Sequence, residues 1–302
     1  MTLHHARRAF RGAPSPAPLP APTGTGAWSA FWGGQGAQGL CLQMAGEGLQ
    51  QTLGVHWAMV ARSLPPQERV LDLGCGAGVV GKLLLVERPD LAIHGVDSAD
   101  IPPGLGKGPV IHTGVAMEAL PFAEASFGAA VSQFGFEYGD PQRTAPELAR
   151  VLRPGAPFSF LVHHRHSSVL AANAARRAAL IDLRAGPLRK AFVDGDVARF
   201  PRLLHRLAAR HAGIDIVRQL AGTLPLRLSL DRPRRIALWE GIDAALAPEA
   251  LILDALLRAA QSPQSLAHWL APLRAAFTAV EAAPVARPGG ALLAWHVSGR
   301  RG

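Results

Sequence analysis

Short apolar runs alternate with segments of helical periodicity between residues 69 and 164. The runs "RVLDLG", "LAIHGVD", "PVIHTG", "SFGAAVSQF" and "APFSFLVHH" have the almost continuous apolar character of strands that are buried on both faces. Segments such as "GVVGKLLLVER" and "PQRTAPELARVL" lie between them and have the pattern of amphipathic helices. The alternation predicts an α/β fold with a doubly wound parallel sheet.

The pattern changes after the last of these strands. Residues 166–275 are rich in Ala, Leu and Arg, and their apolar residues recur every three or four positions, as in "RFPRLLHRLAARH" and "PEALILDALLRAA". This spacing predicts a helical block. The chain then closes with "FTAVEAAPV" and "ALLAWHVSG" around the turn "ARPGG", which predicts a hairpin. Because the helical block falls between the fifth strand and this hairpin, we expect it to fold over the sheet as a lid.

The N-terminal segment has the composition of a flexible tail. Residues 1–26 contain no acidic side chain and alternate proline with small residues. The arginine-rich start resembles an organellar transit peptide, but the prolines argue against the amphipathic helix that such a peptide needs. A helix is expected at about residues 49–64, before two prolines. The predicted divisions are a tail (1–26), a core (27–165), a helical insertion or lid (166–275) and a terminal hairpin that completes the core sheet (276–302).

Composition narrows the class of protein. The 302 residues are 49% hydrophobic and 18% charged, which is globular composition. The net charge of +9 comes mostly from arginine, and it fits either a solvated basic surface or an anionic partner. Two cysteines, Cys41 and Cys75, are too few for a disulfide framework, so we expect a reducing compartment, the cytoplasm. No apolar run approaches the roughly 18–20 residues of a membrane span, and we expect no transmembrane segment.

A glycine-rich turn follows the first predicted strand, in "VLDLGCGAGVVG" at residues 70–81. Glycines allow a tight turn and a close approach to a ligand, and the following helix offers free N–H groups. Gly76, Gly78 and Gly81 match the dinucleotide fingerprint G-x-G-x-x-G, and Asp97 would then supply the acid for the ribose. This spacing alone leaves a nicotinamide-dependent oxidoreductase open.

The same segment has a second pattern, in which an acid inside the strand precedes the first glycine by two positions. Downstream, "GVAMEALPFAEASFGAAVSQF" and "ELARVLRPGAPFSFLVHH" follow it. Together these residues resemble the class I S-adenosylmethionine-dependent methyltransferases, in particular the group that includes the ubiquinone and menaquinone C-methylases. The resemblance covers about residues 70–164, and the terminal hairpin extends it. It implies a Rossmann-like seven-stranded sheet, with an antiparallel strand inserted between two parallel ones at its end, and S-adenosyl-L-methionine as cofactor.

The resemblance assigns expected roles to the cofactor-binding residues. Along the methionine part of the cofactor we expect the motif residues Asp72, Gly74, Gly76 and Gly78. We expect Asp97 at the ribose hydroxyls and Ser98 beside the ribose or adenine. The family's usual acid before the LPF segment is missing here, so Met117 and Glu118 are expected near the adenine, although Met117 could equally be a core residue. The full set of expected cofactor contacts is Asp72, Gly74, Cys75, Gly76, Gly78, Asp97, Ser98, Met117, Glu118 and Gln133.

The acceptor side is expected at the end of the fourth strand, since ligands bind at the carboxyl edge of such sheets. Gln133, Phe134, Glu137 and Tyr138 lie there, and Tyr138 could orient a substrate, act as a base or only pack. The motifs of DNA amino-methylases, cytosine C5 enzymes, ribose 2′-O enzymes and magnesium-dependent catechol enzymes are absent. A small-molecule acceptor is therefore the leading prediction. An RNA or protein methyltransferase that docks through the basic helices, and a non-catalytic cofactor-binding relative, stay open.

Three histidines occur together in "FLVHHRHSS" at the end of the fifth strand. His163 and His164 are neighbours on a strand, so their side chains point to opposite faces and do not readily share one metal ion. No nearby cysteine or acid completes a ligand set, and we predict no metal site. One of the two could face the pocket as a base or a substrate-orienting group. The candidate catalytic residues are therefore His163, His164 and Tyr138.

Overall fold

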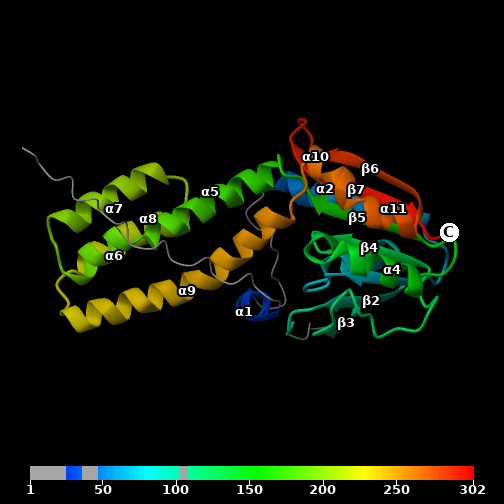
Figure 1. The fold of residues 1–302 in the computed structure, drawn as a ribbon, viewed down its shortest axis with the longest axis horizontal. Helices are drawn as coiled ribbons and strands as arrows, with labels where there is room; N and C mark the ends of the chain where they lie inside the picture. Colours follow the sequence, from blue (N-terminus) through cyan, green and yellow to red (C-terminus); the bar gives the residue numbers. More distant parts are fainter. Residues whose placement is uncertain (1–24, 36–46, 103–107) are drawn as a thin grey trace, which may run out of the picture.

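A seven-stranded sheet forms the larger of two lobes in the computed structural model, which describes residues 25–35, 47–102 and 108–302 (Figure 1). The predicted tail lies outside these residues, apart from Thr25 and Gly26. The sheet has the order β3-β2-β1-β4-β5-β7-β6. Its strands are β1 (Arg69–Leu73), β2 (Ala92–Asp97), β3 (Val110–Thr113), β4 (Ala129–Gln133), β5 (Pro157–His163), β6 (Thr278–Ala286) and β7 (Leu292–Arg300).

The first five strands are parallel, and β7 runs antiparallel to both of its neighbours, β5 and β6. The predicted Rossmann-like sheet, with an antiparallel strand between two parallel ones at its end, is therefore confirmed. Each parallel strand delivers its carboxyl end to the same edge of the sheet. The ends of β1, β2, β4 and β5 define where a ligand can meet several strands at once.

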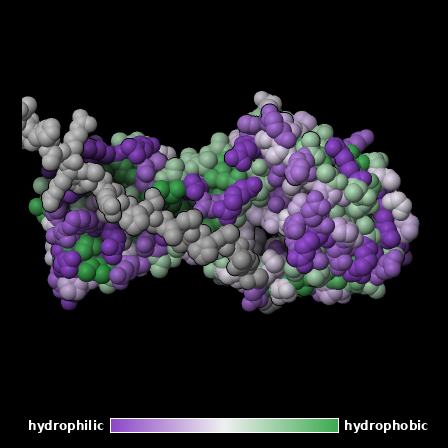
Figure 2. Space-filling view, in the orientation of Figure 1, coloured by the Kyte–Doolittle hydropathy of each residue, from purple (hydrophilic) through white to green (hydrophobic). Residues whose placement is uncertain are grey.

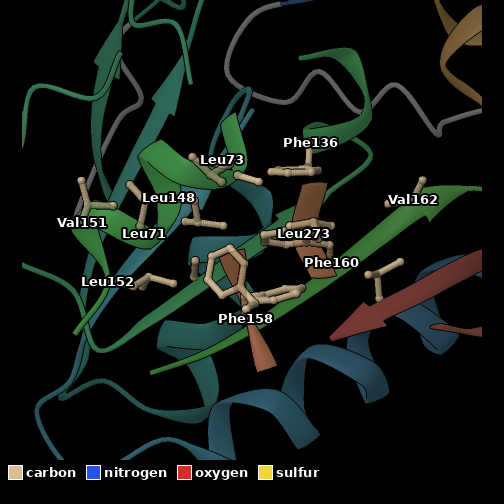
Figure 3. Packing of buried hydrophobic residues seen from close by; sticks show 14 of the residues in the cluster. Leu71, Leu73, Phe136, Leu148, Val151, Leu152, Phe158, Phe160, Val162 and Leu273 are labelled. Carbon is tan, nitrogen blue, oxygen red and sulfur yellow. The ribbon is translucent and has the colours of Figure 1, made fainter. Parts of the chain in front are cut away.

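Helices cover both faces of the sheet. On one face α2 (Glu47–Ser63) and α3 (Val79–Glu87) bury side chains against Val70, and on the other α4 (Pro141–Val151) packs against Leu71. Successive residues of β1 thus enter two different cores, as the period of two requires. Figure 3 shows the second core, where fully buried Phe158 and Phe160 pack with Leu273 and residues of α4.

The smaller lobe is helical, and its chain leaves the sheet after β5 and returns before β6. Its helices are α5 (Ser168–Leu183), α6 (Gly186–Val193), α7 (Arg199–Arg210), α8 (Asp215–Thr223) with the 3-10 turn η3 (Leu224–Arg227), and α9 (Arg232–Ala259). Buried residues such as Phe192, Phe200 and Trp239 form a separate core within it. In Figure 1, α5 and α9 lead from the sheet to the far end of this lobe. Figure 2 shows a mostly hydrophilic surface on the sheet lobe and small apolar patches on the helical lobe.

Two helices of the predicted insertion pack with the sheet. The helices α10 (Pro263–Trp269) and α11 (Ala271–Ala276) contribute Leu266, Leu270 and Leu273 to the core around β4 and β5. The division of the chain at residue 275 stays a prediction, but these contacts associate residues 263–276 with the sheet. No helix among the described residues is both long enough and apolar enough to cross a bilayer.

A short helix precedes the core. It is α1 (Thr25–Gln35), which lies beside α9 (Figure 1). Its Trp32 packs with Ala77, Ala99 and Ile101, and the Ser29 hydroxyl accepts a hydrogen bond from the Asp100 N–H at 2.9 Å. Both contacts hold α1 over the loops that follow β1 and β2.

Candidate functional site

A cavity of about 670 Å³ lies at the carboxyl edge of the parallel strands, between the sheet, α1 and the helical lobe. Most of the predicted cofactor residues line it. From the sheet lobe these are Asp72, Gly74, Cys75, Gly76, Asp97, Ser98, Met117, Glu118 and Gln133, together with Phe134, Tyr138 and His163. Gly78, His164 and Glu137 do not line it.

The glycine loop between β1 and α3 brings backbone to the wall of the cavity. Gly74 and Gly76 have φ values of 63° and 50°, which side chains rarely tolerate. A Cβ atom on Gly74 would lie 2.7 Å from the Gly135 Cα, and one on Gly76 would lie 2.4 Å from the Trp32 ring. The loop therefore needs glycine for its conformation and for its close contacts.

Asp72 is the most unusual charged group in the cavity wall. Its residue is 1% exposed, and neither carboxyl oxygen has a hydrogen-bond partner in the described structure. Burial, and secondly the negative charge of Asp97, raise the pKa of Asp72 to about 8, although the Gly81 N–H exerts a weaker opposing attraction. An unpaired buried carboxylate is costly, so this site is suited to a ligand that brings a cation or several donors.

Asp97 ends β2 and organises the next part of the wall. Its Oδ2 accepts from the Gly76 N–H and its Oδ1 from the Ala99 N–H, each at 2.9 Å. Burial raises its pKa. Each oxygen has a further lone pair, so the carboxylate can accept from two adjacent hydroxyls. Exposed Ser98 follows it at the cavity.

Other predicted residues are held in place by polar contacts. The Glu118 Oε1 accepts from the Asp140 N–H at 2.8 Å, and Met117 packs closely against Gly139. The buried Trp57 indole N–H donates to the Gln133 Oε1 at 2.6 Å. The amide group of Gln133 therefore keeps its NH₂ for another partner.

Aromatic rings gather where β4 and β5 end. The Phe134 ring stacks on the His163 ring with centroids 4.2 Å apart, and the backbone of Phe134 has φ = 55°. Such a conformation is strained for a non-glycine residue and is frequent at functional sites. The Tyr138 ring stands edge-on to His163 at 6.3 Å and to Trp28 at 5.5 Å. These four side chains come from three distant segments of the sequence.

His163 is buried and uncharged. Burial lowers the pKa of its imidazole to about 3, and its Nδ1 has no partner in the described structure. The backbone N–H of His163 donates to the Glu137 Oε1 at 2.9 Å. A ring that strongly resists protonation is a weak base at neutral pH, so this environment favours an orienting role.

His164 points away from the cavity, because successive side chains alternate along a strand. Its ring stacks on Trp295 with centroids 4.4 Å apart, and its Nδ1 accepts from the His166 N–H at 3.0 Å. The structure therefore does not bring His164 to the site. Within residues 25–35, 47–102 and 108–302, no group of three or more His, Cys, Asp or Glu side chains is arranged to hold a metal ion.

The helical lobe supplies a second wall that the sequence did not predict residue by residue. Arg176 of α5 is paired with Glu249 of α9, through a contact from Nε and a hydrogen bond from Nη2 to Oε2 at 3.0 Å. No local signal distinguishes these two residues from the many other charges of the block. The wall consists of Asn173, Arg176, Asp215, Ile216, Gln219, Glu249, Ile252, Leu253 and Leu256.

The sheet side of the cavity fits S-adenosyl-L-methionine on its chemistry. The unpaired Asp72 carboxyl suits the ammonium group, Asp97 suits the two ribose hydroxyls, and the glycine loop leaves room between them. Fold and donor set together define a class I methyltransferase domain. Residues 71–160 match the family model of the methyltransferase domain, and this match supports S-adenosyl-L-methionine as the cofactor. The narrower likeness to ubiquinone and menaquinone C-methylases stays a prediction.

Similar proteins cover the chain to different extents. The malonyl-[acyl-carrier protein] O-methyltransferase of Herminiimonas arsenicoxydans is 31% identical over 117 residues, which are 37% of this chain and 44% of that protein. The chain thus matches less than half of the length of this curated relative. A solved S-adenosylmethionine-dependent methyltransferase from Mesorhizobium loti is 23% identical, over 36% of this chain and 53% of that chain, with a TM-score of 0.31. The Burkholderia thailandensis 1,6-didemethyltoxoflavin-N1-methyltransferase is 15% identical, over 96% and 94%, with a TM-score of 0.46.

Proposed function

We propose that the protein transfers a methyl group from S-adenosyl-L-methionine to a small-molecule acceptor. The observation that carries this proposal is the buried Asp72 carboxyl, which lies in the cavity wall beside the glycine loop and has no hydrogen-bond partner in the described structure. The match of residues 71–160 to the methyltransferase domain supports it independently. When bound, the cofactor supplies a methyl group that is already activated on a positively charged sulfur.

The residues of the chain then have binding and positioning tasks. Asp72 accepts from the ammonium group, and Asp97 accepts from the ribose hydroxyls. The hydrogen bond from the Gly76 N–H to the Asp97 carboxylate holds the glycine loop. Phe134, His163 and Tyr138 form the part of the wall that an acceptor would contact. Bound there, the cofactor would supply its methyl group, and Phe134, His163 and Tyr138 would hold the acceptor atom in line with it. Holding the two partners in line can supply up to roughly 7–11 kcal/mol of the barrier.

The position of the cavity supports a small acceptor. Its walls come from α1, the sheet edge, α5, α8 and α9, and its volume is about 670 Å³. The helical lobe excludes water from one side, which strengthens every polar contact inside. A methylated RNA or protein would have to insert a single group past these walls.

Calorimetry tests the proposal directly. We expect S-adenosylmethionine and its product S-adenosylhomocysteine to bind at micromolar concentration, and NAD to give no heat. Binding of NAD instead would restore the dinucleotide interpretation of the glycine loop. No heat with either sulfur compound at sub-millimolar concentration would refute the proposed cofactor. Labelled cofactor incubated with small-molecule extracts, and with total RNA as a control, then distinguishes the acceptor classes.

A further inference from the structure

The helical half of the cavity contains very little positive charge, although the lobe that forms it is rich in arginine. Among the residues that the structure describes, Arg176 is the only arginine or lysine that lines the cavity. Acidic side chains outnumber it in the lining, with Asp215 and Glu249 on the helical side alone. The other described arginines of the helical lobe therefore lie outside the lining of the cavity.

Arg176 is already neutralised. Its side chain is 16% exposed, and two of its nitrogens contact both carboxyl oxygens of Glu249, which is 32% exposed. The hydrogen bond to Glu249 raises the pKa of Arg176, and Asp215 adds a weaker attraction. A planar guanidinium bound through two nitrogens has little capacity left for a second carboxylate.

An anionic acceptor would therefore enter an unfavourable environment. It would lose its hydration and find no unpaired cation among the described residues of the lining, since Arg176 is paired with Glu249, and Asp215 is paired with Arg218. The paired groups still offer hydrogen bonds. Arg176 keeps N–H donors, and the amides of Asn173 and Gln219 offer both donors and acceptors.

Apart from these polar groups, the cavity has aliphatic side chains and a flat aromatic surface. Ile252, Leu253 and Leu256 present aliphatic side chains from α9. The stacked rings of Phe134 and His163 line the same cavity at the end of the sheet. Planar rings favour offset stacking on such a surface.

We propose, on the basis of the function proposed above, that the acceptor is a small uncharged molecule with a flat, largely apolar ring system. Its ring lies between the stacked Phe134 and His163 and the aliphatic side chains of α9. Its polar edge is hydrogen-bonded by the Arg176–Glu249 pair and the neighbouring amides. The ion pair thus selects by charge, because it rejects a carboxylate that an unpaired arginine would bind.

Two probes of equal ring size test this selection. Calorimetry on the full-length protein saturated with S-adenosylhomocysteine measures the affinity for 2-naphthol, which is uncharged at pH 7.5, and for 2-naphthoate, an anion. We expect 2-naphthol to bind at least about tenfold more tightly. In Glu249→Gln the guanidinium loses its charged partner, and we expect the affinity for 2-naphthoate to rise about tenfold while that for 2-naphthol changes less than about twofold.

Asp254→Asn is the matched control. Asp254 also lies on α9 and pairs with an arginine of α5, Arg177, but neither residue lines the cavity. We expect this variant to keep the wild-type ratio of the two affinities. Arg176→Gln is the second variant, which leaves Glu249 unpaired and should weaken 2-naphthoate binding further.

The outcomes separate this proposal from the function on which it rests. Stronger binding of 2-naphthoate than of 2-naphthol by the wild-type protein would overturn it, as would an equal shift in Glu249→Gln and Asp254→Asn. Binding of neither probe at about 1 mM, while S-adenosylhomocysteine binds normally, would also overturn the flat, uncharged class. Failure to bind S-adenosylhomocysteine would instead refute the proposed methyltransferase function.

Discussion

The two walls of the cavity differ in whether their buried ionisable groups have partners within the protein. On the sheet side, Asp72 is 1% exposed and its carboxyl group has no partner in the described structure. On the helical side, Arg176 of α5 is paired with Glu249 of α9. A buried charge without a partner costs stability, whereas a paired one is satisfied within the protein. The sheet side therefore has a buried acid that a charged ligand can pair with, whereas the ion pair of the helical side is complete within the protein.

Removing the Asp72 charge gives the strongest test of this contrast. In Asp72→Asn we expect the affinity for S-adenosylhomocysteine to fall about 10- to 150-fold, because a charge-assisted hydrogen bond is worth roughly 1.5–3 kcal/mol. The free energy of unfolding without ligand should stay the same or rise at pH 8, since a desolvated carboxylate is removed. Calorimetry and urea unfolding measure the two quantities. Unchanged affinity would mean that the ligand does not contact this carboxyl group.

The pH dependence of binding tests the same group without a mutation. In the folded protein the pKa of Asp72 is about 8, against 3.8 in an ordinary environment. Below pH 8 the ammonium group of the ligand must displace a proton, so affinity should rise with pH, by at most about tenfold per unit, and level off above 8. Calorimetry in buffers of different ionisation enthalpy would report the released proton. Affinity that falls with pH would contradict this account.

The free energy of unfolding should fall as pH rises, whereas the affinity for the ligand should increase. Between pH 4 and 8 the folded ligand-free protein holds the Asp72 proton that the unfolded chain has lost, so the free energy of unfolding falls as pH rises. Burial also raises the pKa of Glu137, to about 7, which adds a fall in the same direction. In Asp72→Asn the slope between pH 5 and 8 should become shallower without vanishing. Urea unfolding across this range measures it, and an unchanged slope would argue against the raised pKa of Asp72.

Breaking an ion pair on the helical side should lower the free energy of unfolding moderately, whereas Asp72→Asn should leave it unchanged or raise it. Glu249→Gln leaves a mostly buried arginine without its charged partner, and we expect a loss of about 1–3 kcal/mol in the free energy of unfolding. Asp254→Asn should cost less, about 0.5–1 kcal/mol, because its pair is more exposed. Urea unfolding of both variants checks the order. A stabilised Glu249→Gln protein would remove the distinction between the two walls.

The smallest effect is expected at Glu137, which is buried on the sheet side but does not line the cavity. Glu137→Gln keeps the Oε1 acceptor for the His163 N–H and should change the affinity for S-adenosylhomocysteine by less than about twofold. Calorimetry at pH 7.5 measures it. A large loss would show that a buried carboxyl group of this lobe affects binding without lining the cavity.

Local pattern was sufficient for the strands of the sheet, and the family resemblance named most of the residues that line the sheet side of the cavity. Buried apolar runs predict parallel strands. An acid two positions before the glycine-rich turn identifies Asp72, because the backbone conformation of that turn depends on neighbouring residues. Asp97 follows from its position at the end of a strand. Pattern was insufficient for α1, whose Trp32 packs on Gly76 from outside the predicted core helices. It also grouped α10 and α11 with the lid, since helical periodicity does not reveal the surface that a helix covers.

The sequence by itself determined the class of domain, the succession of strands along the chain and the carboxylates Asp72 and Asp97 of the sheet-side wall, because these depend on residues close together in the chain. Tertiary structure decided which of the two adjacent histidines faces the cavity, since that depends on the orientation of β5. It also selected Arg176 among many arginines by placing it against Glu249, 73 positions away. The charge of the acceptor wall follows from that single long-range pairing, which no local pattern of residues encodes.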